Sequence, residues 1–212
     1  MISKGNSHMV KRRIAVVALA ALFAAMPIPA YAGPGDEATP KKARSFAVRH
    51  PLPFKFGERL TYDVKFSRFP IHANVGEITF NVAKPNGSDQ HIKFEVSAVS
   101  RGALVSLFGI KVKDTFTTLA DRNDLFVYST IKNIHENDYR SREEAVFDRQ
   151  SAKVRYRAVD PAAPTAAPRS QIEQETRPWV QDIVSAIYFA RTRKLKNVGR
   201  EVHFPVSDQG QT

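Results

Sequence analysis

The chain has 212 residues, of which 32 are Lys or Arg, 21 are Asp or Glu and none is Cys. The absence of cysteine excludes disulfides, cysteine-ligated metal sites and a thiol nucleophile. Hydrophobic residues make up 42% of the chain and charged residues 25%, which are ordinary values for a globular protein, so we expect a single folded domain.

The first 32 residues have the pattern of a secretory signal peptide. Basic residues at 11–13 precede 13 apolar residues at 14–26, and the triplet Ala30-Tyr31-Ala32 supplies a cleavage site. The apolar run is shorter than the ~20 residues of a membrane-spanning helix, so removal after Ala32 is predicted rather than anchoring. Met9 is an alternative start to Met1, because it stands just before the basic residues.

Export changes the partners that the composition suggests. A net charge of +11 taken alone points to nucleic acid, but residues 1–32 carry four basic residues and no acid, which leaves +7. We expect the mature chain in the periplasm of a Gram-negative bacterium, without nucleic acid and without a transmembrane span. A basic mature chain could bind a lipid or another anionic amphiphile. The alternative is that the protein is basic but has no specific anionic ligand.

The mature chain reads as a leader followed by strands. Residues 33–53 contain four prolines and no periodicity, which predicts a disordered leader. From residue 54 onward apolar and polar side chains alternate, as in half-buried antiparallel strands. Gly76 is expected to mark a bulge or a close backbone approach, and residues 101–108 fit either a helical turn or a strand. Turns separate seven predicted strands, at 60–66, 76–82, 92–98, 110–118, 125–134, 139–147 and 153–159.

One amphipathic helix is predicted after a Pro- and Ala-rich loop at 161–168. Five apolar residues share one helical face, and Gly199 ends the pattern: Val180, Ile183, Val184, Ile187 and Tyr188. Such a helix needs an apolar surface to cover. The predicted fold class is mainly β, a large curved antiparallel sheet or half-barrel with one amphipathic helix packed on it, although a sandwich or barrel fits the same strands.

The folded domain is predicted over residues 54–212 and is expected to be incomplete. Residues 202–206 read as one arm of a hairpin, a turn follows at 207–210, and the sequence stops at Thr212. We therefore expect the natural protein to continue with further strands.

Two groups of residues resemble the DUF3108 family of exported proteins. The first group is an F-x-x-G-E-x-L-x-Y-x-V element, formed by Phe54, Gly57, Glu58, Leu60, Tyr62 and Val64. The second is the helical segment Gln181-Asp182-x-x-Ser185-Ala186-x-Tyr188-x-x-Arg191. The resemblance implies a predominantly β domain that continues beyond this chain, with no established active site. A likeness to the curved half-barrels of envelope lipoprotein carriers is a fold-level analogy only.

The helix also supplies the candidate ligand-binding residues. Asp182, Ser185, Tyr188 and Arg191 are spaced by three, so successive members are neighbours on the helix surface. Arg191 could meet a carboxylate or phosphate bidentately, while Phe80 and Phe94 would line an apolar pocket under the helix. The alternative is that the four helical residues dock and cap the helix, and that the Phe residues form core.

The acids suggest a second class of function. Asp114, Glu136 or Asp148 could serve a carboxylate-dependent hydrolase if they converge, with Arg140 or Arg142 nearby, whereas dispersed acids would make salt bridges and turn caps. Glu143 and Glu144 should point to opposite faces of their strand. Residues 135–138 carry atoms that can ligate metal, but they read as a hairpin loop, so no metal, catalytic residue or cofactor is predicted.

The expected function is a non-enzymatic, exported envelope protein that binds a lipid or other amphipathic ligand in a cleft between sheet and helix. The alternatives are an envelope hydrolase that acts on polysaccharide and an assembly factor whose partner completes a sheet edge.

Overall fold

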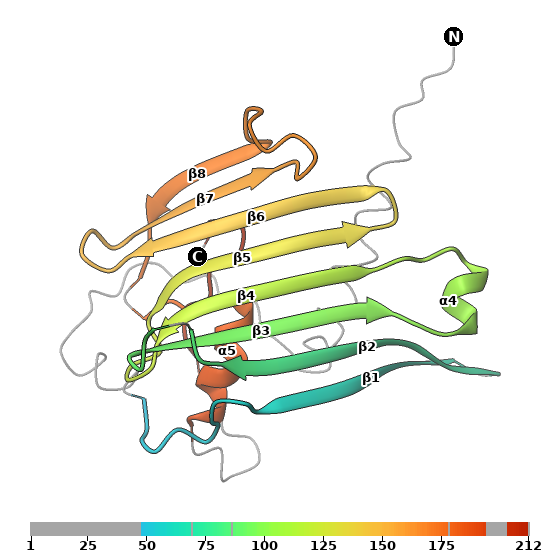
Figure 1. Cartoon of the computed structure of the whole chain (residues 1–212), viewed down its shortest axis with the longest axis horizontal. Helices are drawn as coiled ribbons and strands as arrows, with labels where there is room; N and C mark the ends of the chain where they lie inside the picture. Colours follow the sequence, from blue (N-terminus) through green and yellow to red (C-terminus); the bar gives the residue numbers. More distant parts are fainter. Residues whose placement is uncertain (1–47, 69, 86, 178, 194–202, 212) are drawn as a thin grey trace. The chain divides into compact units, whose positions relative to one another are not determined.

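A computed structural model of the chain describes residues 48–68, 70–85, 87–177, 179–193 and 203–211. The predicted signal peptide and most of the predicted leader lie outside these residues. The described part contains one sheet of eight antiparallel strands whose spatial order follows the chain (Figure 1). The strands are β1 (Arg59–Arg68), β2 (Ile71–Ala83), β3 (His91–Ser100), β4 (Lys113–Asp121), β5 (Val127–Glu136), β6 (Tyr139–Asp148), β7 (Lys153–Val159) and β8 (Ser170–Glu175). The predicted mainly β fold is confirmed, as an open antiparallel sheet.

The alternating pattern of the strands gives the sheet two different faces. In β3, Ile92, Phe94 and Val96 are buried while their neighbours in sequence are partly exposed. The helix α5 (Ile183–Arg191) packs against β3 and β4 on the side of these three residues, which we call the inner face. The outer face is polar, and there Glu144 binds both Arg142 and Arg157. Glu143 and Glu144 therefore lie on opposite faces, as predicted.

The helix begins later than its apolar pattern predicted. The apolar spacing started at Val180, but Trp179 has a φ of 65° and Asp182 is the N-cap, so the helix starts at Ile183. The buried helical residues are Val184, Ser185, Ala186, Tyr188 and Phe189. Val180 instead packs in a core cluster with strands β5–β7. Among the described residues, no helix combines the length and the apolar character that crossing a membrane requires.

The eighth strand was not predicted. β8 has the sequence SQIEQE, in which Ile172 is the only apolar residue, and it pairs with β7 at the edge of the sheet. An edge strand of this kind is stabilised by backbone pairing and carries charge on its exposed side. Hydrophobic alternation therefore gives no signal for it.

The glycine in β2 has the role that the sequence indicated. A bulge shifts the register between Val64 and Lys65, next to the pair Val64–Gly76. A Cβ at Gly76 would lie 2.9 Å from the carbonyl oxygen of Val99. Residues 101–108, which were ambiguous, contain the short helix α4 (Ala103–Leu107) between β3 and β4.

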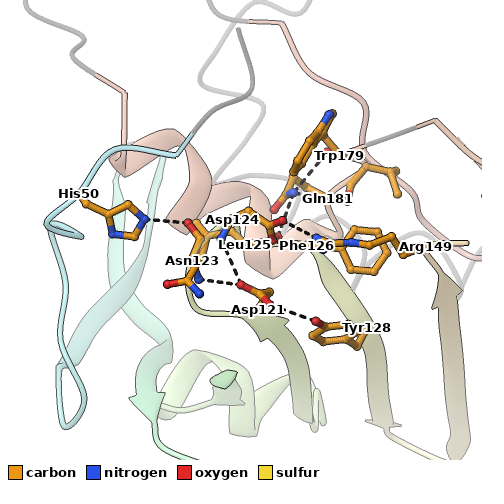
Figure 2. Close-up of polar contacts among 11 residues, drawn as sticks. His50, Asp121, Asn123, Asp124, Leu125, Phe126, Tyr128, Arg149, Trp179 and Gln181 are labelled. Atoms are coloured by element: carbon orange, nitrogen blue, oxygen red, sulfur yellow. Dashed lines mark hydrogen bonds and ion pairs between the residues drawn. The ribbon is translucent and has the colours of Figure 1, made fainter. Parts of the chain in front are cut away.

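The β4–β5 turn connects the sheet to the start of the helix (Figure 2). The carboxylate of Asp121 accepts hydrogen bonds from the backbone N–H of Asn123 at 2.7 Å and from the hydroxyl of Tyr128 at 3.1 Å. The buried amide of Gln181 donates to the carbonyl of Leu125 at 3.3 Å. These bonds hold the turn and position the residue that precedes the helix N-cap.

Candidate functional site

Asp182 and Ser185 form the N-terminal cap of α5. The Asp182 carboxylate accepts from the backbone N–H of Ser185 at 2.8 Å, and Ser185 Oγ accepts from the backbone N–H of Asp182 at 2.9 Å. The second oxygen of Asp182 accepts from the hydroxyl of Thr118 on β4 at 2.6 Å. All three residues are buried, so this reciprocal cap also fastens the helix to the inner face.

Tyr188 is the central contact between α5 and the sheet. Its ring stacks on Phe94 with the ring centroids 4.0 Å apart, and Phe54 packs edge-on against both rings. Phe80 is buried on the same face of β2. Among the described residues no group bonds the Tyr188 hydroxyl, and burial raises its pKa to about 12.

Arg191 makes the bidentate carboxylate contact that its position suggested, but the carboxylate belongs to the same chain. Its two terminal nitrogens donate to Glu58 at 2.5 and 3.0 Å, and these bonds raise the pKa of Arg191. The guanidinium also lies over the rings of Phe54 and Tyr188. Glu58 is 133 residues away in sequence, so spacing along the helix could not identify it.

Five of the six predicted site residues, Asp182, Ser185, Tyr188, Arg191 and Phe94, therefore have packing or bonding roles where the helix meets the sheet and Glu58. The sixth, Phe80, is buried on the same face and packs against Tyr62 of β1. A neighbouring space of about 10 Å³ lies between Asp182, Thr130, Lys132 and Tyr156. That volume holds about one water molecule, whereas ligand pockets measure about 300–1,000 Å³. A role in ligand binding for these six residues stays a prediction, and this interface leaves little room for a ligand.

Beyond the helix, the inner face continues with large apolar side chains that are partly exposed. Tyr62 and Phe66 on β1 are 47% and 41% exposed, and Ile71 on β2 is 46% exposed. The register places Tyr62 opposite the buried Ile78, and Phe66 lies four pairs further along, on the same face. These residues extend the apolar core past the area that α5 covers, and we call them the open apolar strip.

Three acids lie on the inner face of β4, β5 and β6, separated from this strip by β3. Asp114 accepts from the backbone N–H of His135 at 2.8 Å, and its own pKa is raised by burial. Burial and the charge of Asp114 raise the pKa of Glu136 to about 7, with a smaller effect of Glu143. Two of the three acids named for a hydrolase, Asp114 and Glu136, therefore converge.

The other acids and bases named from the sequence do not join this cluster. Asp148 caps its own turn by accepting from Ser151 and Gln150, and Arg142 pairs with Glu144 on the outer face. Arg140 donates to backbone carbonyls of the β5–β6 turn. These side chains have the salt-bridge and turn-cap roles that were the alternative interpretation.

One basic residue that the sequence analysis did not name, Lys132, lies beside the three acids. Lys132 on β5 faces Glu143 at 3.9 Å and forms an ion pair with Asp208 of the C-terminal segment. Burial raises the pKa of Glu143, and Lys132 opposes that shift. Among the described residues, Ser141 Oγ and one oxygen of Glu143 are buried without a hydrogen-bond partner. Strand alternation alone could have placed Lys132, Ser141 and Glu143 on the inner face.

The raised pKa of Glu136 predicts a pH-dependent stability. In the unfolded chain this carboxyl loses its proton near 4.5, whereas the folded protein retains it to about 7. Because the folded state binds the extra proton, stability falls as the pH rises between these values and is constant above them. Glu136→Gln should remove this fall and gain about 2 kcal/mol above pH 7, after allowance for solvent screening. Urea unfolding across the pH range measures it.

Glu175→Gln on β8 is the matched control, because Glu175 is exposed and far from the three acids in the sheet order. The control should keep the pH dependence of the unmodified protein. Parallel curves for Glu136→Gln and the unmodified protein would show that Glu136 titrates normally and would contradict the prediction.

Comparison with known proteins identifies a family but no activity. A family model described as "Protein of unknown function (DUF3108)" matches residues 61–212. No curated protein and no solved structure matches the chain. Within the described ranges, no three His, Asp or Glu side chains are grouped so that they could hold a metal ion.

Proposed function

Because the chain belongs to the DUF3108 family of proteins of unknown function, we propose its function from the geometry: it is an exported, non-enzymatic protein that binds an amphipathic molecule on the open part of the inner face. The open apolar strip carries this proposal. Large apolar side chains on the core face of a sheet, outside the area covered by a helix, are typical of a binding surface.

The apolar part of the ligand would lie along β1 and β2. Tyr62 packs edge-on against Phe80, with ring centroids 5.8 Å apart, so the strip is continuous with the buried core beneath α5. Covering such surface yields about 25 cal/mol per Å² of apolar area removed from water. We therefore place the site beside the helix, in place of the cleft beneath it that the sequence suggested.

The polar part of the ligand would face the acids. Asp114, Glu136 and Glu143 lie on the inner face of β4–β6, and the raised pKa values indicate that added negative charge is unfavourable there. A hydroxyl or ammonium group suits protonated and ionised carboxyls better than a phosphate does. We accordingly propose a neutral or cationic polar group, although the sequence suggested an anionic one.

The test is displacement of the fluorescent probe N-phenyl-1-naphthylamine from the exported, purified protein. We expect monolaurin and dodecylamine to displace the probe at lower concentration than laurate does. The double substitution Tyr62→Ser and Phe66→Ser should weaken probe binding about tenfold or more, because it removes two large apolar contacts. Native mass spectrometry of protein purified from its own host would then identify a natural ligand.

The matched control is Val146→Ser, which removes an apolar side chain of similar exposure from the outer face. It should leave probe binding unchanged. Equal binding by all three proteins, or preferential displacement by laurate, would contradict the proposed site or the proposed polar group.

A second candidate is a hydrolase that acts on polysaccharide, and the Asp114–Glu136 pair favours it. A carboxyl whose pKa is about 7 can donate a proton to a glycosidic oxygen at neutral pH while an ionised neighbour assists. Release of reducing ends from envelope polysaccharide measures this activity. Glu136→Gln should lower the rate by about a hundredfold or more, and equal rates for both proteins would rule out this role for Glu136.

A further inference from the structure

The connection between β3 and β4 exposes two large apolar side chains. Leu107 is 79% exposed and Phe108 is 67% exposed, at the end of the short helix α4. Figure 1 shows α4 projecting from the end of the sheet where the β1–β2 turn also lies. The two residues lie outside the inner-face site and have no part in the proposed ligand binding.

The connection is an ordered structure with its apolar side chains pointing outward. The backbone N–H groups of Phe108 and Ile110 donate to the carbonyls of Leu104 and Val105, at 3.2 and 3.0 Å. Val105 is buried, and so faces the opposite way from Leu107. The exposure of the pair therefore follows from the fold of the loop.

Basic residues flank the apolar pair. Lys111 and Lys113 are exposed, and in the described part of the chain neither forms an ion pair. Arg101, on the other side of the loop, pairs with Glu77 at 2.8 Å. Two exposed lysines beside the apolar tip are therefore available to an anionic partner.

We propose that the loop at 101–113 docks on a membrane surface that contains anionic phospholipid. Leu107 and Phe108 enter the boundary between head groups and acyl chains, and Lys111 and Lys113 lie among the lipid phosphates. Amphipathic surface segments with aromatic or Leu residues beside Lys bind membranes in this manner. A convex tip with unpaired lysines suits a fluid, anionic surface better than it suits a second copy of this basic chain.

The docked loop would bring the open apolar strip close to the membrane. The backbone N–H of Arg101 donates to the carbonyl of Val75 on β2 at 3.1 Å, so the loop packs against the strand that carries Ile71. An amphipathic molecule leaving the bilayer beside the loop would meet this strand first. Membrane docking requires only the loop at 101–113, so the docking proposal does not depend on ligand binding at the inner face.

The test uses a fluorophore placed on the loop of the full chain. The chain has no cysteine, so Ser106→Cys supplies a single labelling site for the environment-sensitive dye NBD. Vesicles of phosphatidylcholine with phosphatidylglycerol should shift the emission of this dye to the blue, and added salt should weaken the effect. Pure phosphatidylcholine vesicles should give a much smaller shift. Because the dye reports its own surroundings, membrane binding elsewhere in the chain does not produce the signal.

Two controls complete the experiment. NBD at Val146→Cys on the outer face should show no shift, and Leu107→Ser with Phe108→Ser should reduce vesicle binding seen at Ser106→Cys by about tenfold or more. These exposed substitutions should leave unfolding unchanged. The proposal is overturned if NBD at position 106 shows no emission shift with anionic vesicles, or if the variant with Leu107→Ser and Phe108→Ser shows an equal shift. It is also overturned if the blue shift occurs without vesicles and light scattering shows that the protein has formed dimers.

Discussion

Phe94→Ala should lower the free energy of unfolding by about 4 kcal/mol. Phe94 has no exposed surface, and its ring is stacked on Tyr188 and packed edge-on against Phe54. Truncation to Ala leaves a cavity where three aromatic rings meet, and such substitutions cost about 3–5 kcal/mol. Urea unfolding followed by circular dichroism measures the loss.

Phe66→Ala is the matched control, because this ring lies on the inner face outside the cover of α5 and is partly exposed. The control should cost less than about 1.5 kcal/mol, as for a substitution at an incompletely buried site. Equal losses for Phe94→Ala and Phe66→Ala would mean that α5 does not close the core over β3, contrary to the structure.

The fold was predictable where the pattern of burial is regular. Ile92, Phe94 and Val96 alternate with polar residues, and that period of two identified both the strand and its buried face. β8 lacks such a period, because an edge strand can be stabilised by backbone pairing alone. The helix start was misplaced because Val180 fits the apolar spacing, while the capping residue Asp182 determines where the helix begins.

For the candidate site, the sequence predicted which residues take part but not which distant residues they contact. The spacing of Asp182, Ser185, Tyr188 and Arg191 showed that these residues are neighbours, and both docking and ligand binding remained open. The partner of Arg191, Glu58, is distant in sequence, and so is the Asp208 partner of Lys132. Such pairs depend on strand register and on the path of the chain over the sheet, which periodicity does not specify.

The convergence of Asp114 and Glu136 shows the same limit. Asp114 is the second residue of β4 and Glu136 is the last residue of β5, so antiparallel pairing brings them to the same end of the sheet. The raised pKa of Glu136 follows from its burial beside a second acid, and burial is a property of the folded sheet. Residue type alone identified Asp114, Glu136 and Asp148 as candidate acids, and the strand topology brings only Asp114 and Glu136 together.

Asp182→Ala should lower the free energy of unfolding by about 3 kcal/mol. The substitution removes the acceptor of two buried hydrogen bonds, one from the backbone of Ser185 and one from the hydroxyl of Thr118. Loss of an N-cap costs about 1 kcal/mol, and a buried donor left without a partner costs about 1–3 kcal/mol more. The helix should detach from β4 first, which hydrogen exchange of the α5 amides would detect.

Asp182→Asn separates the effect of the N-cap hydrogen bond from the effect of the carboxylate charge. Asparagine still offers a side-chain oxygen to the Ser185 N–H and is about as good an N-cap as aspartate, so this variant should lose only about 1 kcal/mol. Asp148→Ala removes a carboxylate that caps an exposed turn, and should cost less than Asp182→Ala. If Asp182→Ala proves as stable as Asp148→Ala, the capping box does not fasten α5, and the four spaced helical residues are left free to serve a ligand.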